Sequence, residues 1–128
     1  MVRKEKPPPL SEVQVEMMNV AWNRGEVTVS EVWKELSKRR VVARNTVQTL
    51  MTRLEEKGWL RHRVEGNTFV YRPAVARSQA LRRMVRRLVD TAFAGSAEGL
   101  VMALLAGRGV SREEAARIRR LIEKEEKR

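Results

Sequence analysis

The sequence predicts a mostly α-helical fold with one small β-hairpin, divided into two modules. Helical periodicity covers most of the chain, and its main interruption is a pair of β-prone runs around a tight turn at residues 59–71. From residue 75 onward the pattern is helical and carries no strand signal. We therefore expect a mixed domain at residues 10–74, a helical module at residues 75–128 and a flexible, proline-rich tail at residues 1–9.

Helix-start signals place two helices ahead of residue 44. Ser11 and Gln14 have the spacing of a capping box, so a first helix begins there, and Gly25 closes it. The β-branched run at residues 27–29 is long enough only for a small edge strand. Ser30 is placed to cap a second helix, whose apolar residues recur at helical spacing.

The third helix, at residues 45–58, has two faces of different chemistry. Its apolar stripe has helical spacing and consists of Val47, Leu50, Met51 and Leu54. The rest of its surface carries mainly short or planar hydrogen-bonding side chains, which suit base edges and phosphates in a major groove. An ordinary amphipathic surface helix is the alternative for this stretch taken alone. Gly58 stands where a helix stop is expected.

The segment after this helix predicts a β-hairpin. Two β-prone runs, at residues 59–64 and 68–71, flank a tight Glu-Gly-Asn turn at residues 65–67. Helix, short strand, helix, helix and hairpin is the element order of a winged helix-turn-helix domain, in which the hairpin is the wing. This order favours DNA binding, with the third helix in the major groove and the wing, residues 59–73, on the backbone or in the minor groove.

The candidate DNA-binding residues lie on the third helix, at the start of the second helix and on the hairpin. They are Ser30, Arg44, Asn45, Thr46, Gln48, Thr49, Thr52, Arg53, Arg61, Arg63 and Asn67. Asparagine and glutamine suit adenine, arginine reaches guanine or phosphate, and threonine meets phosphate or a thymine methyl group. Two alternatives stay open, since Arg53 can pair with a nearby carboxylate and Ser30 can act only as a cap. Glu55 and Glu56 indicate that the end of this helix points away from DNA.

Apolar stripes dominate the helical module and predict an interface. The stripe residues are Leu81, Met84, Val85, Leu88, Val89, Ala92, Leu100, Leu104, Leu105, Ile118, Leu121 and Ile122. A module of about fifty residues made of short helices cannot easily bury that much apolar surface alone. We expect mutual burial in a homodimer, with packing on the first domain as the alternative. The arginines opposite the first stripe, Arg82, Arg83, Arg86 and Arg87, form either a solvated face or an extended phosphate-binding surface.

Charge and composition favour a polyanionic partner such as nucleic acid. The 27 Lys and Arg residues against 16 Asp and Glu leave a net charge of +11. No apolar run is long enough to span a membrane and no signal-peptide pattern is present, so we expect a cytoplasmic protein without a membrane partner. There is no cysteine, and the one histidine, His62, is expected as a surface or phosphate-adjacent side chain. We expect no cofactor, no metal site and no enzymatic activity.

These residues resemble a known family. The stretch NTVQTLMTRLEEKGWL, the EGNTFVYRP wing, and then TAFAGS with the apolar helix after it are similar to the penicillinase-repressor family of bacterial transcriptional repressors. That family includes regulators of β-lactamase, methicillin resistance and copper homeostasis. The resemblance, which runs from about Leu10 to about Leu105, implies a dimer that is held by its C-terminal helices and binds a palindromic operator through its winged domains.

Two departures from the family pattern concern the inducing signal. Members that respond to β-lactams are inactivated when a membrane sensor-protease pathway cuts an Asn-Phe bond in the apolar helix, but the matching position here is Ala103-Leu104. Relief by that pathway would therefore use other residues. The copper-responsive branch has a cysteine-rich tail, and this chain has no cysteine.

The sequence thus predicts a homodimeric repressor that blocks transcription at a pseudo-palindromic promoter operator, with one recognition helix for each half-site. Two alternatives belong to other classes. One is a sequence-indifferent basic nucleic-acid-binding protein, in which the net charge of +11 provides most of the binding. The other is a winged-helix interaction module that docks a protein partner through its apolar C-terminal helices.

Overall fold

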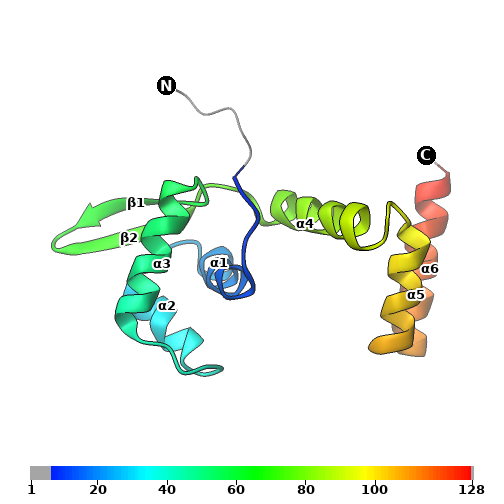
Figure 1. The fold of residues 1–128 in the computed structure, drawn as a ribbon, viewed down its shortest axis with the longest axis horizontal. Helices are drawn as coiled ribbons and strands as arrows, with labels where there is room; N and C mark the ends of the chain where they lie inside the picture. The colour runs from blue at the N-terminus through cyan, green and yellow to red at the C-terminus, as the bar shows by residue number, and fades with distance from the viewer. Residues whose placement is uncertain (1–6, 128) are drawn as a thin grey trace. The chain divides into compact units, whose positions relative to one another are not determined.

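The computed structural model describes residues 7–127 as six helices and one two-stranded hairpin (Figure 1). The elements are α1 (Glu12–Arg24), α2 (Val29–Leu36), α3 (Arg44–Glu56), β1 (Leu60–Glu65), β2 (Thr68–Pro73), α4 (Arg77–Ala92), α5 (Ala97–Gly107) and α6 (Arg112–Glu126). The predicted fold class is confirmed, because the first three helices and the hairpin follow in the order of a winged helix-turn-helix domain.

The chain packs as two compact units that divide within α4, between Met84 and Val85. The first unit holds the hydrophobic core of the described residues. This core consists of Met17, Met18, Ala21, Val27, Val32, Leu36, Val47, Met51, Leu54, Trp59, Leu60, Tyr71, Val75 and Ala80. Because Ala80 is fully buried in this core, the first turn of α4 belongs to the first unit.

The cap of α1 is as predicted, but the cap of α2 is not. Ser11 Oγ accepts a hydrogen bond from the Gln14 backbone N–H at 3.3 Å, and the Gln14 side chain accepts from the Ser11 N–H at 2.9 Å. For α2 the prediction of Ser30 as cap was wrong. Thr28 has the extended backbone of a cap, its hydroxyl accepts from the Glu31 N–H at 3.2 Å, and Glu31 accepts from the Thr28 N–H at 2.8 Å. Ser30 is already inside the helix.

Replacing the observed cap should therefore destabilise the protein. We expect Thr28→Ala to lower the free energy of unfolding by about 1 kcal/mol, because the Glu31 N–H at the start of α2 loses its hydroxyl acceptor. Ser30→Ala is the matched control and should change the free energy of unfolding by less than about 0.5 kcal/mol. Urea unfolding of both variants measures the difference. An equal loss in the two variants would contradict the assignment of the cap to Thr28.

Gly58 ends α3 and turns the chain into the hairpin. Its φ angle of 93° lies in the left-handed region, which glycine adopts without strain. The Gly58 N–H donates to the Glu55 carbonyl at 3.0 Å, and the Trp59 N–H donates to the Leu54 carbonyl at 2.8 Å. This is the hydrogen-bond pattern of a Schellman motif, so the predicted stop is confirmed.

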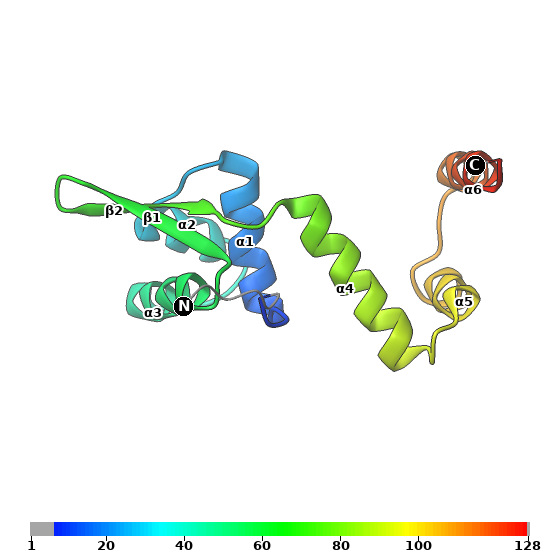
Figure 2. The same cartoon turned by 90° about the horizontal axis from the view of Figure 1, so that it is seen from above.

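The hairpin pairs β1 with β2 in antiparallel register, and it extends beyond α1, α2 and α3 (Figure 2). A single residue of the expected edge strand, Val27, bridges to Tyr71 on the other side of β2, through backbone hydrogen bonds of 2.8 Å and 2.7 Å. The predicted strand at residues 27–29 is thus reduced to one residue. Its second and third residues are used for the cap and the first turn of α2.

Each of the three tryptophans donates its indole N–H to a backbone carbonyl in an irregular segment. The pairs are Trp22–Val75 (2.9 Å), Trp33–Val42 (2.9 Å) and Trp59–Pro8 (3.0 Å). These bonds hold the β2–α4 connection, the turn between α2 and α3, and the end of the N-terminal segment. Pro8 is therefore tied to the first unit, while residues 1–6 of the predicted tail lie outside the described residues.

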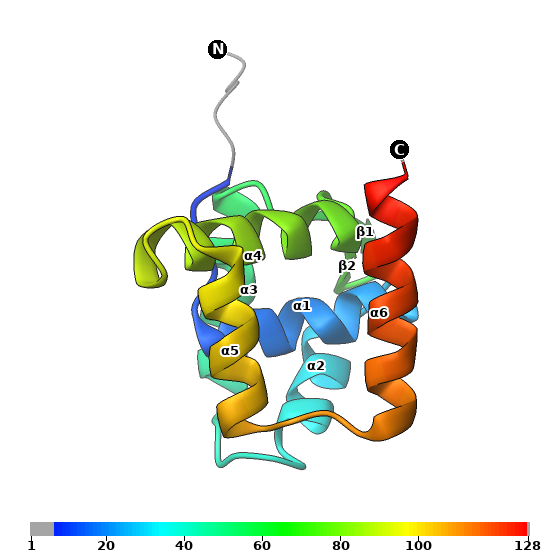
Figure 3. The same ribbon diagram turned by 90° about the vertical axis from the view of Figure 1, so that its right-hand side faces the viewer.

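In the second unit, α5 and α6 run antiparallel (Figure 3). Neither helix contains a buried residue. Ser111 caps α6, because its hydroxyl accepts from the Glu114 N–H at 3.1 Å. Among the described residues no single helix is long and apolar enough to cross a membrane, and only α4 and α5 together, as a bent pair, meet the criterion by length and composition.

Candidate nucleic-acid interface

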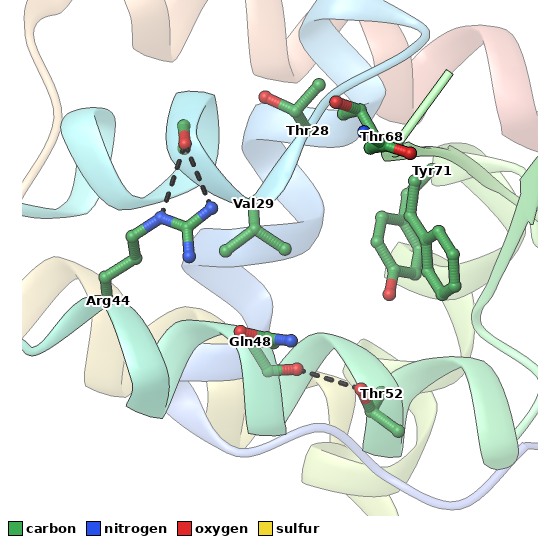
Figure 4. A pocket seen from close by; sticks show the side chains of 10 residues that line it. Thr28, Val29, Arg44, Gln48, Thr52, Thr68 and Tyr71 are labelled. Carbon is green, nitrogen blue, oxygen red and sulfur yellow. Dashed lines mark hydrogen bonds between the residues drawn. The ribbon is translucent and has the colours of Figure 1, made fainter. Parts of the chain in front are cut away.

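A groove of about 500 Å³ lies between α3, the start of α2 and strand β2 (Figure 4). It brings together residues from three segments of the chain, 28–30, 44–52 and 67–71. Its lining consists of Thr28, Val29, Ser30, Arg44, Gln48, Thr52, Asn67, Thr68, Phe69 and Tyr71. Five of the predicted DNA-binding residues are in this lining: Ser30, Arg44, Gln48, Thr52 and Asn67. None of the lining residues is acidic, so the charge of the groove comes from arginine.

Arg44 closes one end of the groove. The Ser30 hydroxyl accepts hydrogen bonds from its Nη2 at 3.3 Å and its Nε at 3.4 Å, which joins the first residue of α3 to the first turn of α2 (Figure 4). Arg44 forms no ion pair with a carboxylate of the described residues. Its positive charge is therefore uncompensated and available to an anion in the groove.

The recognition face of α3 is exposed, as the helical periodicity predicts. Asn45, Thr46, Gln48, Thr49, Thr52 and Arg53 are all exposed. Val47, Met51 and Leu54 on the opposite stripe are buried. The open alternative for Arg53, an ion pair with a neighbouring carboxylate, does not occur among the described residues. Thr52 donates its hydroxyl hydrogen to the Gln48 backbone carbonyl at 3.0 Å, so that hydroxyl is partly occupied within the helix.

The hairpin register separates the predicted wing residues onto two faces. His62 pairs with Tyr71 and Val64 pairs with Phe69, so these four side chains share one face of the hairpin, and Phe69 and Tyr71 of this face line the groove. The odd-numbered residues of β1 point to the other face, and neither Arg61 nor Arg63 lines the groove. Of the three predicted wing contacts, only Asn67 does so.

Arg63 is already held by two carboxylates. Its guanidinium donates to Glu26 at 3.2 Å and forms a second ion pair with Glu65. The hydrogen bond from Arg63 holds the pKa of the Glu26 carboxyl below its usual value. A phosphate contact by Arg63 would therefore have to compete with these two partners.

Sequence reasoning missed the connection between Glu55 and His62. The Glu55 carboxylate lies 2.6 Å from His62 Nδ1 and accepts from the His62 backbone N–H at 3.2 Å. The His62 ring stacks on Phe69 with 4.0 Å between ring centroids. Tyr71 is buried beside them, and this burial, followed by the Glu55 charge, raises the pKa of its hydroxyl. Glu55 therefore faces the wing, and His62 is half-buried instead of lying free on the surface.

Phe69 is the second residue that sequence reasoning missed. It lines the groove and remains 47% exposed, although it is a large apolar side chain. The alternation of the hairpin carried a usable signal, because Phe69 lies two residues before the buried Tyr71 and so points to the same face.

Comparisons with known proteins agree with this geometry. A family model described as penicillinase repressor matches residues 10–124. The penicillinase repressor of Bacillus licheniformis is 31% identical over 124 residues, which are 97% of each chain. A solution structure of the DNA binding domain of the repressor BlaI is 40% identical, covers 58% of this chain and 90% of that chain, and superposes with a TM-score of 0.52. The monomeric form of Bacillus licheniformis BlaI in complex with the blaP half-operator is 41% identical, covers 57% and 89% of the two chains, and gives a TM-score of 0.50.

Proposed function

The chain belongs to the penicillinase repressor family, and on this premise we propose that it represses transcription by binding a pseudo-palindromic promoter operator as a homodimer. One observation carries the proposal. Arg44, Gln48 and Asn67 converge from the recognition helix and the wing on one groove without an acidic lining residue. A groove of this composition suits a phosphate backbone and the base edges beside it.

In the proposed complex, α3 enters the major groove and the wing lies on the neighbouring backbone or minor groove. Asn45 and Gln48 would meet adenine, Arg44 and Arg53 guanine or phosphate, and Asn67 a phosphate. The exposed hydroxyl groups of Thr46 and Thr49 would reach phosphate or a thymine methyl group. The complex of the BlaI relative with its half-operator supports one winged domain for each half-site.

The proposed dimer interface is the apolar surface of the second unit. Eight large apolar side chains of this unit are exposed: Val85, Leu88, Val101, Met102, Leu104, Leu105, Leu121 and Ile122. Exposure on this scale within about forty residues marks an interaction surface. A second copy of the chain fits best, because a two-fold dimer presents two recognition helices to a palindromic site.

Proteolysis that releases the repressor from its operator would cut the chain within this same surface. Ala103-Leu104, the position that matches the cut bond of the β-lactam-responsive members, lies inside α5, and both residues are exposed. A cut there would separate α6 from the rest of the apolar surface. We propose that any protease acting here recognises residues other than an Asn-Phe pair, because the chain has Ala-Leu at this position.

Selection from random DNA tests the proposed function without knowledge of the operator's location. At near-physiological salt, we expect the full chain to enrich an inverted repeat and to bind it about a thousandfold or more tightly than scrambled DNA. Affinity for both DNAs should fall steeply with salt, because phosphate contacts release counterions. A selection that enriches no motif would instead support the sequence-indifferent binder.

A further inference from the structure

The recognition helix and the wing are joined by an acidic side chain. Glu55, in the last turn of α3, has one carboxylate oxygen 2.6 Å and the other 2.8 Å from His62 Nδ1 of β1. The His62 backbone N–H also donates to this carboxylate at 3.2 Å. One side chain of the recognition helix thus binds both the backbone and the ring of one wing residue.

The connection continues through His62 to the wall of the groove. Its ring is nearly parallel to Phe69, at an angle of 12°, and is tilted by 49° to Tyr71 at 5.5 Å. Phe69 and Tyr71 both line the groove that also contains Gln48 of the recognition helix. A shift of Glu55 would therefore be transmitted through packed rings to the surface facing the groove.

The outer part of the wing has few other contacts that could fix its position. In β1 every residue after His62 is exposed, and a two-stranded hairpin alone is marginally stable in water. The base of the hairpin is held by its backbone bridge to Val27 and by the buried side chains of Leu60 and Tyr71. Two polar side-chain contacts add to these, that of Glu55 with His62 and the ion pair of Arg63 with Glu26. Of these two contacts, only that of Glu55 comes from the recognition helix.

We infer that Glu55 is a positioning residue of the DNA interface, which sets the wing relative to the recognition helix through His62. The inference rests on the proposed function. A carboxylate so close to the proposed interface repels DNA by its charge, so its removal has two opposing effects on binding. The loss of the charge favours binding, whereas the loss of the link to His62 leaves the wing free to take positions that do not fit the DNA.

Comparison with a substitution at the neighbouring Glu56 separates the effect of the charge from the effect of the link to His62. Glu56→Ala removes the same charge one residue away, from an exposed side chain that forms no hydrogen bond or ion pair with the hairpin among the described residues. Glu55→Gln removes the charge of Glu55 but keeps an oxygen that can accept from the His62 N–H. Glu55→Ala removes both. The three variants, made in the full chain, form a matched series.

Binding to the selected operator and hydroxyl-radical footprinting give the first readout. We expect Glu56→Ala to bind as tightly as the unmodified protein or more tightly. Glu55→Ala should bind about threefold to tenfold more weakly than Glu56→Ala and should lose protection on the wing side of each half-site, while protection by α3 persists. Glu55→Gln should lie between the two. Equal affinity and equal footprints for Glu55→Ala and Glu56→Ala would overturn the inference.

Hydrogen exchange in the absence of DNA gives the second readout. Exchange of the β1 and β2 amides should be faster in Glu55→Ala than in Glu56→Ala, with α3 unchanged. Faster exchange throughout the first unit would assign Glu55 an ordinary stabilising role and overturn the inference. If the unmodified protein shows no operator preference, the proposed function fails. The exchange measurement still decides whether Glu55 holds the wing.

Discussion

Leu88→Asp is expected to leave a folded protein that no longer forms a dimer and that binds its full operator about 100-fold to 10,000-fold more weakly. Leu88 is 45% exposed on the apolar stripe of α4, so the substitution removes little packing from the single chain. In a dimer the same position would bury an unpaired carboxylate in apolar surroundings, which is strongly unfavourable. The loss in operator affinity is that of a bivalent ligand converted into a monovalent one.

Sedimentation equilibrium and gel shifts on full and half operators measure this effect. Gln79→Asp is the matched control, because it adds the same charge to an exposed residue of the same helix, nine positions away and therefore on the opposite face. The control should remain a dimer, and both variants should bind an isolated half-site with similar affinity. A Leu88→Asp protein that remains a dimer with unchanged operator affinity would exclude α4 from the interface.

Local sequence signals were sufficient where a single short pattern decides the structure. The capping box at Ser11 and the stop at Gly58 depend on neighbouring residues alone, and both are present as predicted. The buried stripe of α3 follows from helical spacing. The same spacing predicts which residues of α3 lie on its exposed face. Of these elements, α3 forms one wall of the groove through Arg44, Gln48 and Thr52, and the other seven lining residues come from the start of α2 and the hairpin.

The error at the start of α2 arose because two local signals overlap. Residues 27–29 are β-branched and favour a strand, while Thr28 and Glu31 have the spacing of a capping box. A strand at residues 27–29 leaves Ser30 as the first residue that can cap the helix, so the strand signal leads to the wrong cap. In the structure only Val27 pairs with β2, and Thr28 caps the helix.

The wing could not be resolved from sequence for a different reason. Alternation along a strand shows that Arg61 and Arg63 share one face and that His62 and Val64 share the other, but it does not show which face packs on α3. That choice depends on the direction in which the turn at Gly58 sends the strand, and on Glu55 meeting His62 seven residues later. Contacts of this kind arise from tertiary structure and leave no local pattern.

Gln48→Ala is expected to reduce operator affinity tenfold to a hundredfold, about 1–3 kcal/mol, with little effect on binding to scrambled DNA. The Gln48 side chain is exposed and lines the groove, where its amide can form two hydrogen bonds with an adenine edge. The hydrogen bond that Thr52 donates to Gln48 uses the backbone carbonyl, so the substitution leaves it intact. Alanine also favours the helix, and the fold of α3 should not change.

Gel shifts on the operator and on scrambled DNA measure the ratio of the two affinities. Gln79→Ala, the same substitution on the exposed surface of α4, is the control and should leave both affinities unchanged. A similar loss on both DNAs would assign Gln48 to the phosphate backbone, since backbone contacts carry no sequence information directly. If neither affinity falls, Gln48 makes no contact that contributes to binding, and the sequence is read by other residues of α3 or by the wing.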